Sequence, residues 1–496
     1  MQRTSADGVT VLWTPARTPD PDLLTAELSF GTGIQDETAP TLGVTQVIAA
    51  LVRSEAGDRP HDVVIDVEEE RTSFAAHGTA EEITDFLRAV CRAVSALPLD
   101  RLGRTARLLG IHDPATRDHR GAEPLSARYG PHGNGLALQQ DPGMYSWITA
   151  DMVRAHAAAR FTRGNAVLAL DGPPPEGLTL PLPDGPRPRR TAPRPRPGVG
   201  GTWQHRPLDT VSLLFTSRAW EPAAVAAHLV LGRRVDRTTY GERGIADAAI
   251  EHWFLRDRST LDRVLTLHPA DGHAEEAAHV LWRSTLDLAS GGPGQEELDE
   301  FTAGVREQLD AADGHWRSLN RAVDAEHFGV PYCDDATLLE AYAAVTPQDV
   351  RDFLQRVLPD AVLVVPHQTH PDLKTPRGTP LPNSDCWRLH AEHPPTQGTV
   401  FRMTPLRRAT SRRDERGEYV LTPWGIVTRD GNQDEHDIRF DEIALVLPDG
   451  PGRVVLTGCG CDMHVYPHQV RHGERLVAAL DAAVPAHLVR PTPDTP

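Results

Sequence analysis

A duplicated stretch of sequence constrains the fold of this chain more than any other feature. Residues 148–154 read ITADMVR and residues 345–351 read VTPQDVR. In each copy a threonine is placed to cap a helix by accepting a backbone N–H near its start. Each helical stretch then leads into a short apolar run, residues 165–170 and 360–365, which predicts a buried strand. The chain therefore contains an internal repeat of a large α/β unit.

The blocks that end in these copies also begin alike. Residues 23–30 and 210–215 are both predicted to be strands that lead into helical sequence. Two proline-rich breaks separate the blocks, and proline favours extended backbone and removes a backbone donor. We interpret the arginines of the first break as solvated, with binding to an acidic partner as the alternative.

We therefore predict an α+β protein in which two homologous α/β halves form a clamshell, followed by a small β-rich C-terminal domain with one helix. A continuous parallel sheet through both halves would contradict this organisation. The predicted boundaries are 8–172 for the first half, 173–201 for a Pro/Arg-rich linker, 202–366 for the second half, 367–416 for an irregular linker and 417–490 for the C-terminal domain.

Charge and composition narrow the class of partner. The 69 acidic residues outnumber the 51 basic ones, and the net charge of −18 disfavours binding to nucleic acid. No apolar run approaches the roughly 20 residues that span a bilayer, so we expect no membrane span. Residues 1–10 lack the apolar core of a signal peptide, and the five scattered cysteines favour a reducing compartment. We expect a cytoplasmic protein, and its single lysine among many arginines is typical of a GC-rich bacterial genome.

Three stretches in the first half carry a likeness to a known family. Residues 28–37, LSFGTGIQDE, followed by residues 42–45, LGVT, resemble the start of insulinase-like zinc peptidases. This family includes pitrilysin and the mitochondrial processing peptidase. Residues 149–172 resemble the helix and strand that close a half in that family. The resemblance covers residues 10–366 and implies the family's two-half fold.

The resemblance also implies where zinc chemistry would lie. The family carries H-x-x-E-H on its first helix, where two histidines bind zinc and the glutamate activates the zinc-bound water. The aligned positions here are Gln46, Ala49 and Ala50, and no glutamate occurs at residues 109–112, where the resemblance places the last ligand. Alanine cannot bind zinc and an amide binds it poorly. We therefore expect no metal, no cofactor and no catalytic residue of this type.

The resemblance implies a second pair of functional positions, an arginine and a tyrosine that hold substrate backbone. They align with Tyr240 (or Gly241) and with Asp247, and Arg243 is displaced from the pattern. The implied function is a catalytically inactive homologue that binds protein or peptide, as partner of a zinc-bearing homologous subunit in a heteromeric peptidase. Two alternatives stay open: an active zinc metalloendopeptidase subunit that contributes half of a shared chamber, and a passive structural scaffold.

The last block alternates short strand-like runs with turn residues and ends in a helix at residues 474–483. It resembles a pleckstrin-homology-like domain, which implies docking to protein. Cys459, Cys461 and His464 have metal-binding side chains, but their spacing is unlike that of a structural zinc site, so we expect no metal there. Residues 68–71, EEER, are interpreted as a solvated strand end.

Overall fold

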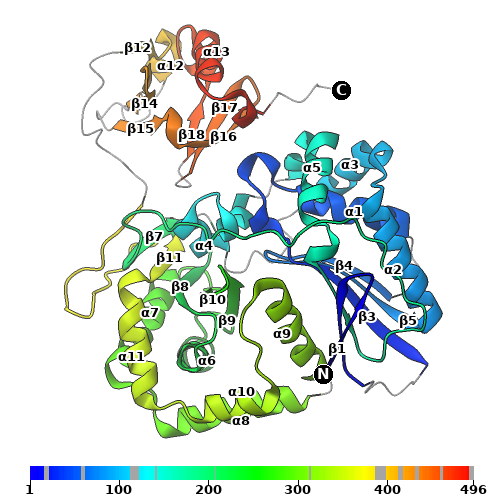
Figure 1. Cartoon of the computed structure of the whole chain (residues 1–496). Coiled ribbons are helices and arrows are strands. Elements are labelled where there is room, and N and C mark those ends of the chain that lie inside the picture. The colour runs from blue at the N-terminus through cyan, green and yellow to red at the C-terminus, as the bar shows by residue number, and fades with distance from the viewer. Residues whose placement is uncertain are drawn as a thin grey trace.

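The computed structural model describes residues 1–15, 22–56, 62–111, 122–139, 142–206, 208–311, 314–385, 398–410, 417–429, 435–458 and 462–490. Two large mixed sheets with their helices form the first and second halves, and a smaller unit follows them (Figure 1). None of the helices in the described ranges combines the length and the apolar character that crossing a membrane requires.

The two large sheets repeat one topology. Their strand orders are β2-β6-β3-β5-β4 and β7-β11-β8-β10-β9, and β1 extends the first sheet beyond β2. In each sheet the first pair is parallel and the other pairs are antiparallel. The internal repeat predicted from the sequence is therefore confirmed. The strands are β1 (Gln2–Ala6), β2 (Val9–Trp13), β3 (Leu23–Phe30), β4 (Asp62–Val67), β5 (Thr72–Thr79), β6 (Ala166–Leu170), β7 (Thr202–Arg206), β8 (Val211–Arg218), β9 (Ile250–Leu255), β10 (Thr260–Leu267) and β11 (Val362–Pro366).

The helix caps that defined the repeat form as predicted. Thr149 accepts a hydrogen bond from the backbone N–H of Met152 at 3.3 Å. Thr346 and Asp349 form a reciprocal capping box, with distances of 3.2 and 2.9 Å. The helices of the first half are α1 (Val44–Ala56), α2 (Ala80–Ser95), α3 (Leu102–Ile111), α4 (Ala122–Tyr129) and α5 (Ala150–Arg160); those of the second are α6 (Pro222–Asp236), α7 (Ala274–Gly291), α8 (Gln295–Asp310), α9 (Gly314–Phe328), α10 (Asp335–Ala343) and α11 (Pro347–Val357).

Each sheet packs its own helices on one face and a helix of the other half on the opposite face. The alternation of side chains along a strand sends Val11 and Leu168 into the core under α1, α2 and α5. Leu12, Val167 and Ala169 point the other way and pack against α9 of the second half.

The second sheet repeats this arrangement (Figure 1). Leu213 and Phe215 pack under α6, α7 and α11, whereas Leu214 and Val264 contact Leu125 and Tyr129 of α4, from the first half. The hydroxyl of Tyr129 also donates a hydrogen bond to Asp262 of β10 at 2.6 Å. The two halves therefore exchange one helix each.

Because of this exchange, the two halves are expected to unfold together. Val323 of α9 is fully buried, so Val323→Ala should lower the free energy of unfolding by about 2 kcal/mol. Hydrogen exchange measured by mass spectrometry should then accelerate by the same factor in both large sheets. Val400→Ala, at a position that is 45% exposed, should change neither the free energy of unfolding nor the exchange rates of the two large sheets. Faster exchange confined to the first sheet would contradict a cooperative pair.

The linker, residues 173–201, lies along both halves instead of running free. Arg190 is largely buried and donates to the carboxylate of Asp36 at 2.6 Å and to the carbonyl of Glu70 at 2.8 Å. Arg187 donates to the carbonyl of Glu326 at the end of α9. The interpretation of the linker arginines as solvated is therefore wrong for Arg187 and Arg190, because acceptors that are distant in sequence bind their guanidinium groups.

The C-terminal unit has two sheets, β12-β13-β14-β15 and β16-β17-β18, with α13 packed in their common core. Strand β12 lies inside the segment 367–416, which the sequence predicted to be irregular. It pairs with β13, which follows that segment. A strand of four residues gives too weak a pattern to identify alone. The elements are β12 (Thr399–Arg402), α12 (Pro405–Thr410), β13 (Glu418–Leu421), β14 (Gly425–Arg429), β15 (Glu435–Arg439), β16 (Ile443–Asp449), β17 (Gly452–Thr457), β18 (Asp462–Val465) and α13 (Gly473–Ala483).

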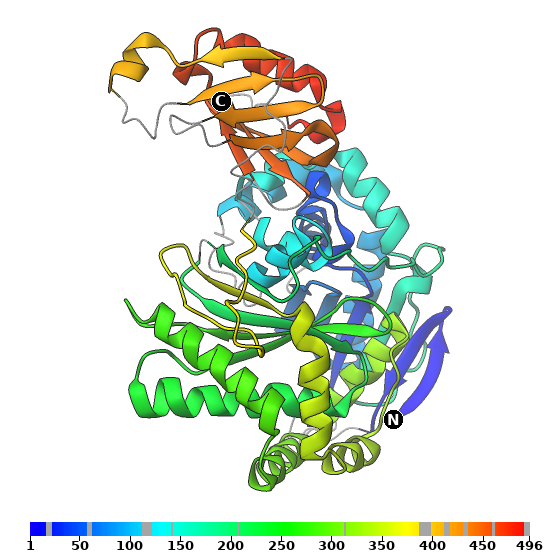
Figure 2. The same cartoon turned by 90° about the vertical axis from the view of Figure 1, so that its left-hand side faces the viewer.

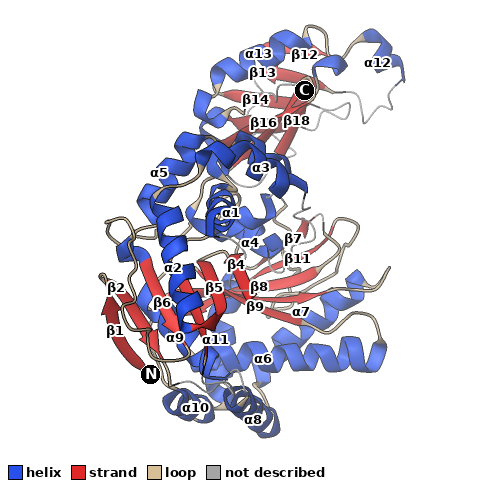
Figure 3. Cartoon of the chain, turned by 90° about the vertical axis from the view of Figure 1, so that its right-hand side faces the viewer, coloured by secondary structure: helices blue, strands red, loops and turns tan. Residues whose placement is uncertain are grey.

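This unit is docked on the first half. Figures 2 and 3 place it at the end that carries α3 and α5. Leu445 and Leu456 join the core of the first half, and the guanidinium of Arg490 lies 5.8 Å from the ring centre of Trp147. Cys459 and Cys461 lie outside the described residues, and His464 is within 3.2 Å of Asp462.

Candidate functional site

Helix α1 begins above a buried carboxylate. Glu37 accepts hydrogen bonds from the backbone N–H groups of Gly43 and Thr45, both at 2.7 Å, and so satisfies donors at the start of the helix. Burial raises the pKa of Glu37 to about 7, although hydrogen bonds from Thr45 and Gly43 oppose the shift. The first turn of α1 is therefore fixed in place from the preceding loop.

The three positions aligned with the zinc motif lie on α1, at the spacing that puts them on one face. Gln46 is 2% exposed and Ala49 is 3% exposed, and Ala49 belongs to the hydrophobic core of the first half. Ala50 is partly exposed. This face of α1 is thus packed with protein atoms where the resemblance would place a metal.

The region of the last ligand lies near α1 but offers no carboxylate. Helix α3, which packs against α1, ends in Leu109, Gly110 and Ile111, and His112 lies outside the described residues. Within the described ranges, no group of three or more His, Cys, Asp or Glu side chains is placed to hold a metal ion. The described residues of this region therefore offer no set of donors of the kind that zinc requires.

The positions aligned with the substrate clamp lie on the surface of the second half. Tyr240 is 63% exposed in a π-helical turn that follows α6, and Asp247 is exposed beyond Gly244. Arg243 is bound to Glu276 at 2.6 Å. Neither Tyr240 nor Asp247 lines the cavity between the halves.

A cavity of about 750 Å³ lies between the halves. The first half contributes the β4–β5 turn, and the second half contributes α6, β9, β10 and the helices from α8 to α10. Apolar and aromatic side chains form much of its wall. They include Trp220, Leu229, Trp253, Phe328 and Tyr342.

Several ionisable groups in this wall are buried, among them Arg263, His228, Glu251 and Glu70. Burial lowers the pKa of Arg263 to about 10 and that of His228 well below its usual value. Burial raises the pKa of Glu251 to about 7, and it also raises that of Glu70. Both ring nitrogens of His228 lack a hydrogen-bond partner within the described residues. The cavity therefore combines apolar surface with a few buried polar groups, as ligand sites do.

The same cavity gives little support for nucleophilic chemistry. Burial and the nearby Asp334 raise the pKa of the Cys333 thiol, so the reactive thiolate is disfavoured.

Sequence reasoning missed this cavity. The run at residues 68–71 was interpreted as a solvated strand end, but Glu70 accepts a hydrogen bond from Leu255 N–H at 2.5 Å. Arg71 lies near Glu27 at 3.5 Å and Asp324 at 3.9 Å. The charged run was the only local signal, and its partners come from distant segments.

The buried Glu37 leads to a test of pH dependence. The pKa of Glu37 is about 7 in the folded protein and 4.5 ordinarily, so the folded state holds the proton more tightly than the unfolded state. The resulting stabilisation is fully present below pH 4.5 and is lost as the pH rises through 7. Glu37→Gln stays neutral. The unfolding free energy of wild type minus that of the variant should therefore fall by roughly 2 kcal/mol between pH 5 and pH 8. A difference that stays constant with pH in denaturant titrations would contradict a buried, neutral Glu37.

Comparison with known proteins gives a fold but no closer relationship. Neither the protein-family models nor the curated proteins include a match to this sequence. Among solved structures, the inactive domain of a peptidase M16 from Pseudomonas fluorescens matches with a TM-score of 0.60 and 18% identity, over 74% of this chain and 99% of that one.

The periplasmic protease PqqL from Escherichia coli is also similar. Its first half matches with a TM-score of 0.55 and 12% identity, over 74% of this chain and 92% of that one. The complete PqqL matches with a TM-score of 0.56 and 12% identity, over 86% of this chain but only 55% of that one. This chain therefore has the fold of M16 peptidase domains and spans about half of the complete protease.

Proposed function

We propose that this chain is a catalytically inactive, peptidase-like subunit that binds protein or peptide and pairs with a homologous subunit bearing the zinc motif. The observation that carries the proposal is the buried face of α1. Gln46 and Ala49 fill it, in a fold similar to that of a domain described as inactive. A chain that kept only a scaffold role would not need a cavity between its halves.

The length of the similar proteases supports a second subunit. This chain matches 92% of the first half of PqqL but 55% of the complete protein. A complete enclosure of that kind needs a further unit of similar size, and the proposed zinc-bearing homologue is of the kind that would supply it. The architecture of the C-terminal unit supports a pleckstrin-homology-like docking domain beside it. A cytoplasmic location is part of the same proposal.

Metal content and peptide cleavage test the inactive character. The purified full chain should contain no stoichiometric zinc and should not cleave a fluorescently labelled tryptic digest. When a zinc-motif homologue is co-expressed, cleavage should appear only in samples that contain the homologue, with or without this chain. Chelator-sensitive cleavage by this chain alone would overturn the proposal and favour an active metallopeptidase.

The cavity between the halves can be tested separately through peptide binding. Leu229→Gln places an amide in the apolar wall and should weaken binding of the labelled peptides about tenfold, the effect of desolvating one polar group. Leu406→Gln, on a side chain that is 78% exposed, is the matched control and should bind as wild type does. Equal affinities for all three proteins would place peptide binding elsewhere, and no binding by wild type would favour a passive scaffold.

A further inference from the structure

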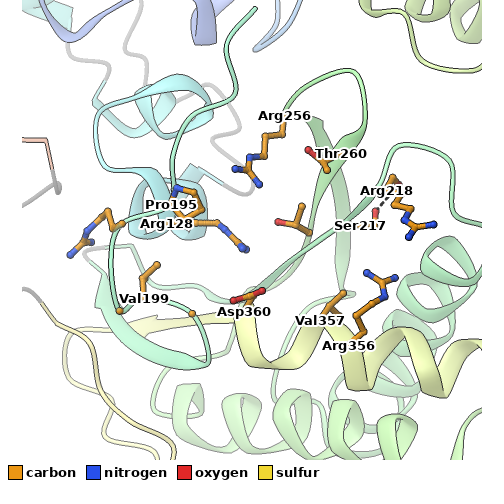
Figure 4. Close-up of a pocket in the computed structure, with 14 residues that line it drawn as sticks. Arg128, Pro195, Val199, Ser217, Arg218, Arg256, Thr260, Arg356, Val357 and Asp360 are labelled. Atoms are coloured by element: carbon orange, nitrogen blue, oxygen red, sulfur yellow. Dashed lines mark hydrogen bonds between the residues drawn. The ribbon is translucent and has the colours of Figure 1, made fainter.

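A second cavity, of about 460 Å³, lies where α4, the linker and the second half meet (Figure 4). The linker contributes residues 195–200, and the remainder of the wall comes from the ends of β8 and α11 and from the β9–β10 turn. The two cavities share no lining residue. They approach each other at the end of β8, where Arg218 lines this cavity and the next residue, Ala219, lines the cavity between the halves. The charge of this second cavity is unusual for an acidic protein. Five arginines line it against a single carboxylate, Asp360: Arg128, Arg196, Arg218, Arg256 and Arg356.

Arg128 is the most deeply placed of these side chains. It is 5% exposed, and its Nε and Nη1 atoms are buried without a hydrogen-bond partner in the described residues. The Nε atoms of Arg196 and Arg256 are in the same condition, although other nitrogens of these two side chains donate to the carbonyls of Ala127 and Pro193. Unpaired buried donors are costly, and charged ones are the most costly. Arginine side chains of this wall therefore carry donors that no acceptor in the described residues satisfies.

Nearby carboxylates offset part of this charge, because Glu221 forms an ion pair with Arg356 and the charges of Arg128 and Arg256 act on the buried Asp262. Asp262 accepts hydrogen bonds from the hydroxyls of Tyr129 at 2.6 Å and Thr216 at 2.7 Å, not from the arginines. The guanidinium carbons of Arg128 and Arg256 lie 5.9 and 5.8 Å from the ring centre of Tyr129. Figure 4 shows these two guanidinium groups turned toward one another. Within the described residues, neither Arg128 nor Arg256 has a carboxylate among its hydrogen-bond partners, which leaves both able to bind an added anion.

We propose that this cavity binds a phosphate group. Arginine presents a planar fork of donors that matches phosphate oxygens, and several arginines suit a group with more than one negative charge. The volume exceeds that of a phosphate alone, and Pro195, Val199 and Val357 offer apolar surface for an organic portion. The site is independent of the proposed peptide-binding role.

Isothermal titration of the full chain at about 0.15 M salt tests the proposal, because generic attraction between exposed charges is screened there. The probes are ADP, pyrophosphate and inorganic phosphate, with citrate as a carboxylate of comparable charge. We expect at least one phosphate probe to bind and citrate to bind at least about tenfold more weakly. Tighter binding of ADP identifies an organic phosphate, and equal binding of inorganic phosphate identifies the free ion; both support the site. Equal binding of citrate, or no binding of any phosphate probe, overturns it.

Arg128→Met provides a second readout. The variant should bind the phosphate probes at least about tenfold more weakly, and a phosphate probe should raise its melting temperature less than that of wild type. Arg306→Met, at an exposed position on α8, should change neither property. A lower melting temperature with unchanged affinity would assign Arg128 a purely structural role and overturn the proposal. Should Arg128→Met fail to fold, Arg256→Gln, at a less buried position, must show the same loss of affinity.

Discussion

Ala49→Glu, which restores the general base of the zinc motif at its aligned position, is expected to destabilise the fold by about 4 kcal/mol or more. Ala49 is 3% exposed and lies in the hydrophobic core of the first half. The larger side chain must displace packed atoms, and its carboxylate would have no metal to bind. Soluble yield and denaturant titration measure the effect.

A control variant and a triple variant accompany this test. Ala248→Glu, at an exposed position beyond Gly244, introduces the same side chain and should remain within about 0.5 kcal/mol of wild type. Restoring Gln46→His, Ala49→Glu and Ala50→His together should not produce stoichiometric zinc binding, because no glutamate occurs at residues 109–112, where the resemblance places the last ligand. A stable triple variant that binds zinc would contradict this prediction, because it would show that a further ligand lies within reach of α1.

Arg190→Ala is expected to lower the free energy of unfolding by about 3 kcal/mol, because it leaves a buried carboxylate with one partner fewer. Asp36 is 3% exposed and contacts both Arg190 and Arg160. Arg190 also lies 4.9 Å from the ring centre of Phe328 in the second half. Denaturant titration measures the loss, and Asp36→Asn in a double-mutant cycle isolates the ion pair.

The neighbouring arginine provides the control for this prediction. Arg189 is exposed, so Arg189→Ala should change the free energy of unfolding by less than about 0.5 kcal/mol. Similar losses for Arg189→Ala and Arg190→Ala would indicate that the linker contributes through its general charge, and would contradict a specific contact with Asp36.

The parts of the fold that were predictable from sequence are those written in local patterns. The caps at Thr149 and Thr346 and the apolar runs after them fixed the repeat, because capping and alternation act over a few residues. The exchange of α4 and α9 left no such pattern. Leu125 of α4 and Leu319 of α9 are ordinary apolar residues, and nothing in the sequence around them tells which sheet each helix covers.

The same division holds for the candidate site. The motif positions Gln46, Ala49 and Ala50 could be assigned because the first helix of the resemblance is contiguous in sequence. The cavity between the halves could not be predicted, because its wall joins the turn at residues 68–71 to side chains such as Arg263 that are far along the chain. Burial, which sets the pKa values there, is a property of the whole fold.

The reciprocal exchange of helices has a consequence for how the chain could be divided. Each half lends a helix to the other and borrows one back, which is the geometry of a domain-swapped homodimer joined into one polypeptide. Cleavage in the linker would leave two fragments, each with one face of its sheet bare: Leu12 and Val167 in the first and Leu214 and Val264 in the second. Neither fragment is a self-sufficient folding unit, so the two should be recovered only as a complemented pair.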